Sequence, residues 1–198
     1  MTKFKFVILW FCMILLTACG PVHVKNPTLY TLAPIHPIEI PAHSLSEKTL
    51  LVSTPIASPG YETSDMIYML TPFQLSAYAQ NRWVAPPAQM LLPVLVQMIR
   101  SVGYFKAVVS VPSVAVTDYR LDIQLLKLQQ EFLLPQSRVR LEIQATLILN
   151  SSEKVIASRK FSAVIEAQNN PFGGVIAANK AVTVVGQEIA HFAANNAQ

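Results

Sequence analysis

The fold of this chain is decided by residues 118–126, which read Asp118-Tyr119-Arg120-Leu121-Asp122-Ile123-Gln124-Leu125-Leu126. Large apolar side chains alternate there with polar ones, and a two-residue period is typical of a strand with one buried face and one wet face. The phase of this alternation slips at Leu125-Leu126, where we expect a β-bulge. The stretch therefore predicts one long strand that lies half-buried in a sheet.

Two further runs follow this strand and continue the same pattern. Residues 138–147 alternate apolar with polar side chains, Asn150 to Lys154 form a polar turn, and residues 155–167 then pair back. Strands joined by short connections pair antiparallel and can keep one face in water. We therefore expect the three runs to form an antiparallel meander.

Shorter strands are predicted upstream of the meander. Residues 49–56 are rich in β-branched and other apolar side chains, and residues 66–70 and 73–79 flank the turn signal Thr71-Pro72. Residues 104–111 form another short run rich in valine. Runs of this length and composition, bounded by turn residues, favour strands.

Two segments show the four-residue apolar spacing of amphipathic helices. The first begins after Pro86-Pro87 and ends at Gly103, residue types that suit the two ends of a helix. Pro93 costs it a hydrogen bond unless the helix starts later or bends there. The second helix follows Gly173-Gly174 and carries its apolar stripe on Ala178, Val182, Val185, Ile189 and Phe192.

These elements together predict the fold class. We expect an α+β fold, with a mostly antiparallel sheet that contains the C-terminal three-strand meander and two main helices packed on one face. We expect residues 49–198 to form a single domain, because that length suits one compact core and no internal repeat is visible.

The N-terminus has the pattern of an export signal. Two lysines precede an unbroken apolar run from Phe6 to Leu16, followed by Thr17-Ala18-Cys19. This run is near the length of a signal core and short for a membrane-spanning helix. It resembles the lipobox of bacterial lipoproteins; an ordinary secretory signal that contains a cysteine, or a single membrane anchor, is the alternative.

The lipobox resemblance implies that residues 1–18 are a signal peptide and that Cys19 carries fatty chains such as palmitate. More than one chain holds a protein stably on a membrane. In bacterial lipoproteins an aspartate just after the cysteine retains the protein in the inner membrane, and here that residue is Gly20. The implied location is the periplasmic face of the outer membrane.

Residues 19–48 are predicted to be a lipidated cysteine followed by a semi-rigid tether. Within the tether, Tyr30-Thr31-Leu32 either adds an edge strand to the domain or only touches it. The prolines of the tether are Pro21, Pro27, Pro34, Pro37 and Pro41.

Composition excludes several classes of function. Of the 15 basic residues, Lys3 and Lys5 leave with the signal, so 13 basic and 11 acidic residues give a formal charge of +2. This balance argues against nucleic acid as a partner. Cys12 also leaves with the signal and Cys19 would be acylated, so no thiol remains for a disulfide, a metal or a nucleophile.

No pattern predicts an enzyme, a metal site or a cofactor. Ser53, Ser58 and Ser64 lie outside any nucleophile-elbow sequence, and no phosphate-binding glycine loop with its lysine is present. No histidine has a partner at ligand spacing, so we interpret all of them as solvated or structural. The four histidines are His23, His36, His43 and His191.

Two surface features are candidates for contacts. The charged residues of the meander predict a solvated ladder of cross-strand pairs or an electrostatic docking face; they are Asp118, Arg120, Asp122, Arg138, Arg140 and Glu142. Phe132, Leu133 and Leu134 stand where polar turn residues are expected, so they either fold back on the core or form an exposed patch that contacts a partner or lipid. Phe172 poses the same question.

The ordered motifs of the chain resemble the auxiliary lipoprotein family of ABC transporters that work with MCE-domain proteins, including the lipoprotein of the paraquat-inducible system. The matching features run from Tyr30 to about residue 195, and their order and spacing carry the resemblance. They are Tyr30-Thr31-Leu32, the Tyr68 strand, Arg82-Trp83 with Pro86, the helix to Gly103-Tyr104-Phe105, Asp118-Tyr119-Arg120-Leu121 and Ala157-Ser158-Arg159-Lys160-Phe161.

This resemblance implies a non-catalytic periplasmic subunit that docks or completes a lipid transport assembly. Its partners would be an MCE-domain protein, with the inner-membrane permease and the ATPase on separate chains, and a homo-oligomer is compatible with this role. The alternatives are another outer-membrane assembly lipoprotein, pilotin-like or a partner in barrel insertion, and a periplasmic hydrolase. The hydrolase lacks any visible site.

Overall fold

The structure is a computed structural model that describes residues 26–34, 39–113 and 115–197. Its centre is the predicted meander, formed by β7 (Tyr119–Glu131), β8 (Arg138–Leu149) and β9 (Lys154–Glu166), which pair antiparallel in chain order. The register of β7 against β8 shifts between Leu125 and Lys127. The expected bulge is therefore present at Leu126, where one extra residue bends the long strand.

Three short strands lie in succession along the other edge of β7. They are β2 (Thr49–Val52), β3 (Ile56–Ala57) and β4 (Asp65–Thr71), and all three pair parallel to β7. Residues 49–71 thus accompany β7 from its start to its end. The sheet is consequently mixed: the meander is antiparallel as expected, and these pairings are parallel.

The remaining strands extend the sheet at its two ends. β5 (Gln74–Trp83) forms an antiparallel hairpin with β4, and β6 (Ala107–Ser110) pairs parallel to β2. β1 (Thr28–Tyr30) pairs parallel to β5, with Thr28 opposite Asn81. Of the two readings of the tether motif, the edge strand is the one that forms, two residues earlier than expected.

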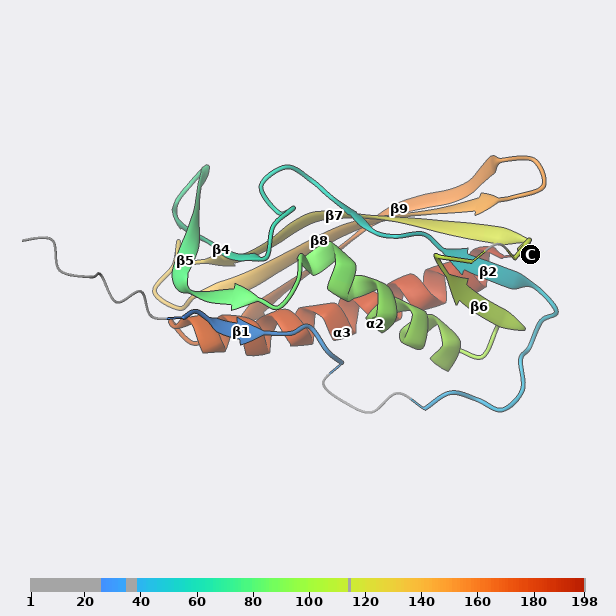
Figure 1. The fold of residues 1–198 in the computed structure, drawn as a ribbon, viewed down its shortest axis with the longest axis horizontal. Coiled ribbons are helices and arrows are strands. Elements are labelled where there is room, and N and C mark those ends of the chain that lie inside the picture. The colour runs from blue at the N-terminus through green and yellow to red at the C-terminus, as the bar shows by residue number, and fades with distance from the viewer. Residues whose placement is uncertain (1–25, 35–38, 114, 198) are drawn as a thin grey trace, which may run out of the picture.

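Both helices cover one face of the sheet, as predicted (Figure 1). α2 (Pro87–Ser101) begins at Pro87, so Pro93 lies inside the helix and the later start is wrong. α3 (Pro171–Asn196) is preceded by Asn170, whose side chain accepts a hydrogen bond of 2.7 Å from the Gly173 N–H. This N-cap satisfies one of the free donors of the first turn.

The hydrophobic core lies between the helices and the sheet. Leu121, Leu141 and Leu147 point into it from β7 and β8 and are fully buried. Phe161 of β9 packs edge-on against Phe192 of α3, with ring centroids 5.4 Å apart. The alternating residues of the meander therefore form the floor on which α3 lies.

Candidate interaction site

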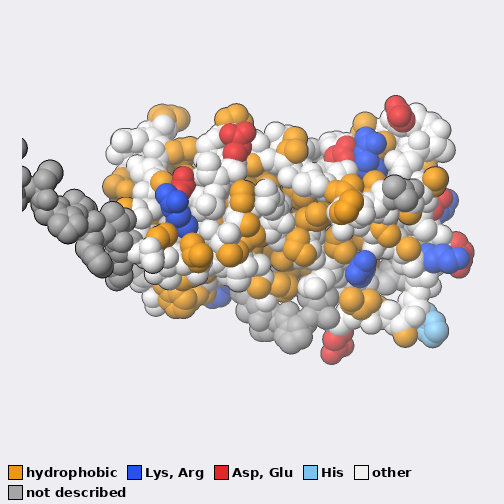
Figure 2. Space-filling view, viewed as in Figure 1, with side chains coloured by type: hydrophobic (Ala, Val, Ile, Leu, Met, Phe, Trp, Pro, Cys, Tyr) orange, Lys and Arg blue, Asp and Glu red, His pale blue; other side chains and the backbone are white. Residues whose placement is uncertain are grey.

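One end of the molecule gathers the residues that the sequence singled out for contacts. The β7–β8 loop, the start of α3, the β4–β5 hairpin and β1 all lie at the left end in Figure 1. Figure 2 shows hydrophobic side chains along this end, from the hairpin to the start of α3. It is therefore the candidate site, and we call it the apolar end.

The β7–β8 loop combines the two expected arrangements: one residue folds back on the domain and two are exposed. Phe132 is half-buried, with its ring edge-on to Tyr68 at 6.2 Å between centroids. Leu133 and Leu134 are exposed, with 36% and 55% of their surfaces accessible. The loop thus folds back through its first residue and presents the next two to solvent.

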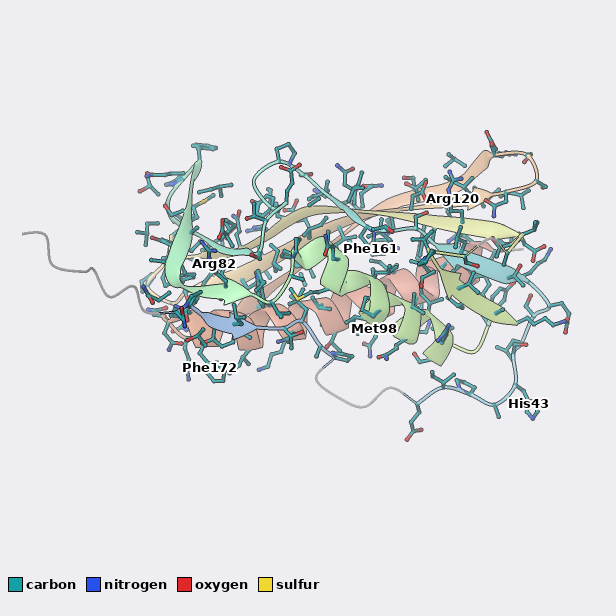
Figure 3. The ribbon with its side chains drawn as sticks, in the orientation of Figure 1. His43, Arg82, Met98, Arg120, Phe161 and Phe172 are labelled. Atoms are coloured by element: carbon teal, nitrogen blue, oxygen red, sulfur yellow. The ribbon has the colours of Figure 1, made fainter. Side chains whose placement is uncertain are left out.

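Phe172 lies at the start of α3, on the outside of the apolar end (Figure 3). It is 56% exposed, and its ring centroid is 6.2 Å from that of Tyr30 in β1. The tilted pair links α3 to the edge strand but leaves most of the Phe172 ring in solvent. Phe172 is therefore exposed at the same end of the molecule as Leu133 and Leu134.

A buried ion cluster fixes the base of the β7–β8 loop. Glu131, the last residue of β7, has only 5% of its side chain exposed. Its Oε2 accepts from Arg138 Nε at 2.9 Å, and its Oε1 accepts from Arg140 Nε at 2.7 Å. Burial raises the pKa of the carboxyl, but hydrogen bonds from Arg140, Gln129 and Arg138 outweigh it, so the pKa lies below its ordinary value. Glu131 is consequently ionised at neutral pH.

A polar network continues from this cluster beneath the hairpin. Gln129 Nε2 donates to Glu131 at 3.0 Å, and the Tyr61 hydroxyl donates to Gln129. The Tyr78 hydroxyl donates to Gln130 at 3.0 Å. Burial raises the pKa of Tyr61 and of Tyr78 to about 12, so both hydroxyls remain proton donors.

Gln130 joins the loop to the start of α3. Its Nε2 donates to Ser137 Oγ at 2.9 Å and to the Gln168 carbonyl at 3.0 Å. A Cβ at Gly174 would overlap the Gln130 side chain, so glycine permits this close approach. The network therefore holds the exposed loop and the helix start in one rigid arrangement.

The expected cross-strand ladder forms only in part. Arg138 and Arg140 reach Glu131, a residue that the sequence analysis missed, and Arg140 lies 3.9 Å from Glu142. The sequence signal that could have revealed Glu131 is the polar run 129–131, which breaks the alternation of β7.

The acidic residues at the start of β7 also depart from the ladder. Arg120 pairs within its own strand with Asp122, at 3.0 Å. Asp118 accepts a 2.7 Å hydrogen bond from Thr49 Oγ1. Asp118 and Asp122 thus stabilise the start of β7, at the end of the sheet opposite the apolar end.

The residues weighed for catalysis do not come together. Ser53 Oγ donates to Asp122 at 2.6 Å, and that carboxylate is paired with Arg120. His43 lies in the loop before β2 and His191 lies on α3, and both are exposed. In the described ranges, no group of three or more His, Cys, Asp or Glu side chains is placed to hold a metal ion. Cys19, His23 and His36 lie outside the described residues.

None of the helices that the structure describes has the length and apolar character needed to cross a membrane.

Comparisons with known proteins concern nearly the whole described domain. The family model of the ABC-type transport auxiliary lipoprotein component matches residues 30–190. A solved protein from Xanthomonas campestris is 23% identical, with a TM-score of 0.75 over 85% of this chain and 96% of its own. No curated protein matches.

Two more distant solved structures share the fold. An uncharacterised protein is 17% identical, with a TM-score of 0.60 over 86% of this chain and 96% of its own. A hypothetical protein from Chlamydia trachomatis is 5% identical, with a TM-score of 0.50 over 76% of this chain and 98% of its own. At these identities the likeness establishes the fold alone.

Proposed function

The chain belongs to the family of ABC-type transport auxiliary lipoprotein components, and on that premise we propose that it is a non-catalytic periplasmic subunit anchored in the outer membrane through Cys19. In this role it docks or completes an intermembrane lipid transport assembly. The family match over residues 30–190 is the observation that carries the proposal.

The anchor follows from the lipobox-like sequence before Cys19 and from Gly20 after it. Residues 1–18 would be removed, and acyl chains on Cys19 would hold the domain at the periplasmic face of the outer membrane. The residues between Cys19 and β1, which include Pro21 and Pro27, would give the domain a short, semi-rigid connection to the bilayer.

The partners would be an MCE-domain protein that spans the periplasm, with an inner-membrane permease and an ATPase on separate chains. The apolar end supports a contact with either a partner or lipid, because Leu133, Leu134 and Phe172 are exposed there while a buried network fixes the backbone beneath them. Rigid, pre-organised contact residues lose little conformational freedom on binding.

The experiment compares Cys19→Ala with Cys12→Ala in the full chain. Mass spectrometry should find a diacylated and N-acylated cysteine at the start of the mature wild-type protein, which should fractionate with the outer membrane and co-purify with the MCE-domain protein. Cys12→Ala is the matched control, because it changes the other cysteine of the sequence, which leaves with the signal, and should behave as wild type.

Cys19→Ala should remain unprocessed and lose the outer-membrane location. An unmodified N-terminus in the wild-type protein would remove the anchor, and co-purification with a barrel or a secretin in place of the MCE-domain protein would overturn the transport role.

A further inference from the structure

The tip of the β4–β5 hairpin exposes an aromatic ring on a strained backbone. Pro72 and Phe73 form the two-residue turn between Thr71 and Gln74, and Phe73 has a φ of 68°. Proline followed by a residue with positive φ is the pattern of a type II turn, where glycine or asparagine is preferred in the second place. Phe73 is also 100% exposed.

Nothing in the fold of the described residues accounts for phenylalanine at this position. The ring buries no surface against the domain, so it contributes no packing, and its backbone conformation disfavours a side chain. A residue that gains no packing and also strains its own backbone indicates a contact outside the domain.

Phe73 stands at the apolar end with the residues already described. The Phe132 N–H donates to the Met69 carbonyl at 2.9 Å, which ties β4 close to its turn to the β7–β8 loop. Leu70, next to the turn, is 62% exposed, and Leu29 of β1 is 57% exposed. Exposed apolar side chains thus project from four separate elements at one end of the molecule.

Several of the charges at this end are paired, whereas the exposed Glu166 at the end of β9 has no ion pair among the described residues. Arg82 lies 3.4 Å from Asp65, and Arg138 and Arg140 share the carboxylate of Glu131. An apolar surface can be placed against the boundary of a bilayer more readily when nearby charges are neutralised in this way.

We propose that the apolar end lies on the lipid bilayer, with Phe73 inserted at the boundary between headgroups and acyl chains. This inference rests on the proposed function, because the acylated Cys19 supplies the anchor. The described chain begins at Asn26, beside β1 at the same end (Figure 1). The seven residues from Cys19 span at most about 25 Å, so anchoring keeps this end near the membrane.

The form of the surface favours lipid over a protein partner. Contact residues between proteins cluster in well-packed, complementary patches. Here Phe73, Leu134 and Phe172 project separately, from a hairpin, a loop and a helix start. Separate protrusions fit a deformable interface, where side chains enter about 5–10 Å.

The experiment places tryptophan at the tip of the full, lipidated protein. Phe73→Trp is reconstituted in vesicles of phosphatidylethanolamine and phosphatidylglycerol that carry a nitroxide quencher on the upper acyl chain. Val116→Trp is the matched control, since Val116 is 99% exposed but precedes the start of β7, whereas the hairpin lies beside its end. Thirteen strand residues separate these positions by about 40 Å.

Emission added by Phe73→Trp over the Trp83 background should fall about twofold with the quencher, because an interfacial ring lies within its reach. Val116→Trp should be unaffected. Wild-type protein that carries no acyl chains and does not float with the vesicles would overturn the anchor and this inference together.

Protein that is acylated and floats while Phe73→Trp remains unquenched would overturn this inference alone. Shielding of Phe73→Trp only after the MCE-domain protein is added would also overturn it, by identifying the tip as a protein contact.

Discussion

Replacing Glu131 by glutamine should destabilise the domain strongly, because it removes the carboxylate that Arg138 and Arg140 share at the base of the β7–β8 loop. The side chain of Glu131 is 5% exposed, whereas those of Arg138 and Arg140 are 32% and 24% exposed. Breaking a fully buried ion pair costs about 3–5 kcal/mol, and arginines that can regain water reduce this to about 2–3 kcal/mol.

Urea unfolding, followed by circular dichroism, measures this effect. With an m-value of about 2 kcal/mol per molar urea, the midpoint should fall by about 1–1.5 M at pH 7. Glu47→Gln is the matched control, since the Glu47 side chain is 84% exposed in its ion pair with Lys106. Exposed pairs contribute little, so its midpoint should not move measurably.

The pH dependence tests the electrostatic reasoning separately. The pKa of Glu131 is lower in the folded protein than in the unfolded chain, so its ionised form contributes stability that is fully present above the unfolded pKa of about 4.3. That contribution is lost as pH falls through the lower folded pKa. The difference between wild type and Glu131→Gln should therefore shrink below pH 4.3; equal midpoints at pH 7, or a constant difference in acid, would refute the reasoning.

Three further substitutions test other parts of the structure by thermal or urea unfolding. Phe73→Gly should raise the free energy of unfolding by about 0.5–1 kcal/mol, because relief of the left-handed backbone exceeds the added entropy of glycine; a lower melting temperature would argue against a strained turn. Asn170→Ala should cost about 1 kcal/mol by removing the N-cap of α3, and an unchanged melting temperature would show that the cap is dispensable. Leu141→Ala should cost about 2–5 kcal/mol through the cavity left in the core, so a loss below 1 kcal/mol would contradict its assigned packing.

The sequence predicts the meander well because its signal is local. The alternation along β7 and the slip at Leu126 depend on neighbouring residues, and the structure confirms both the strand and the bulge. The helices are found in the same way, from the spacing of their apolar residues. Periodicity does not give the order in which β2, β3 and β4 line up along β7, because parallel pairing joins residues far apart in the chain.

The same limit applies to the candidate site. Gln129 and Glu131 look like solvated residues in the sequence. They form a buried network because Tyr61, 68 residues away from Gln129, returns over the strand and because the arginines of β8 reach Glu131. The sequence predicts Phe73 as the first residue of a strand, whereas the structure has it in the turn. Cys19 lies outside the described residues, so its lipidation stays a prediction.

The parallel pairing of β1 has a mechanical consequence for a domain that is held from its N-terminal side. β1 runs along the long axis of the molecule, and a pull on the chain at Asn26 acts along the strand (Figure 1). Such a pull loads all the hydrogen bonds between β1 and β5 at once, whereas a perpendicular pull would open them one by one. Just beyond the strand, the Ala33 N–H donates to Asn179 of α3 at 2.8 Å, so tension that passes β1 is shared with the helix.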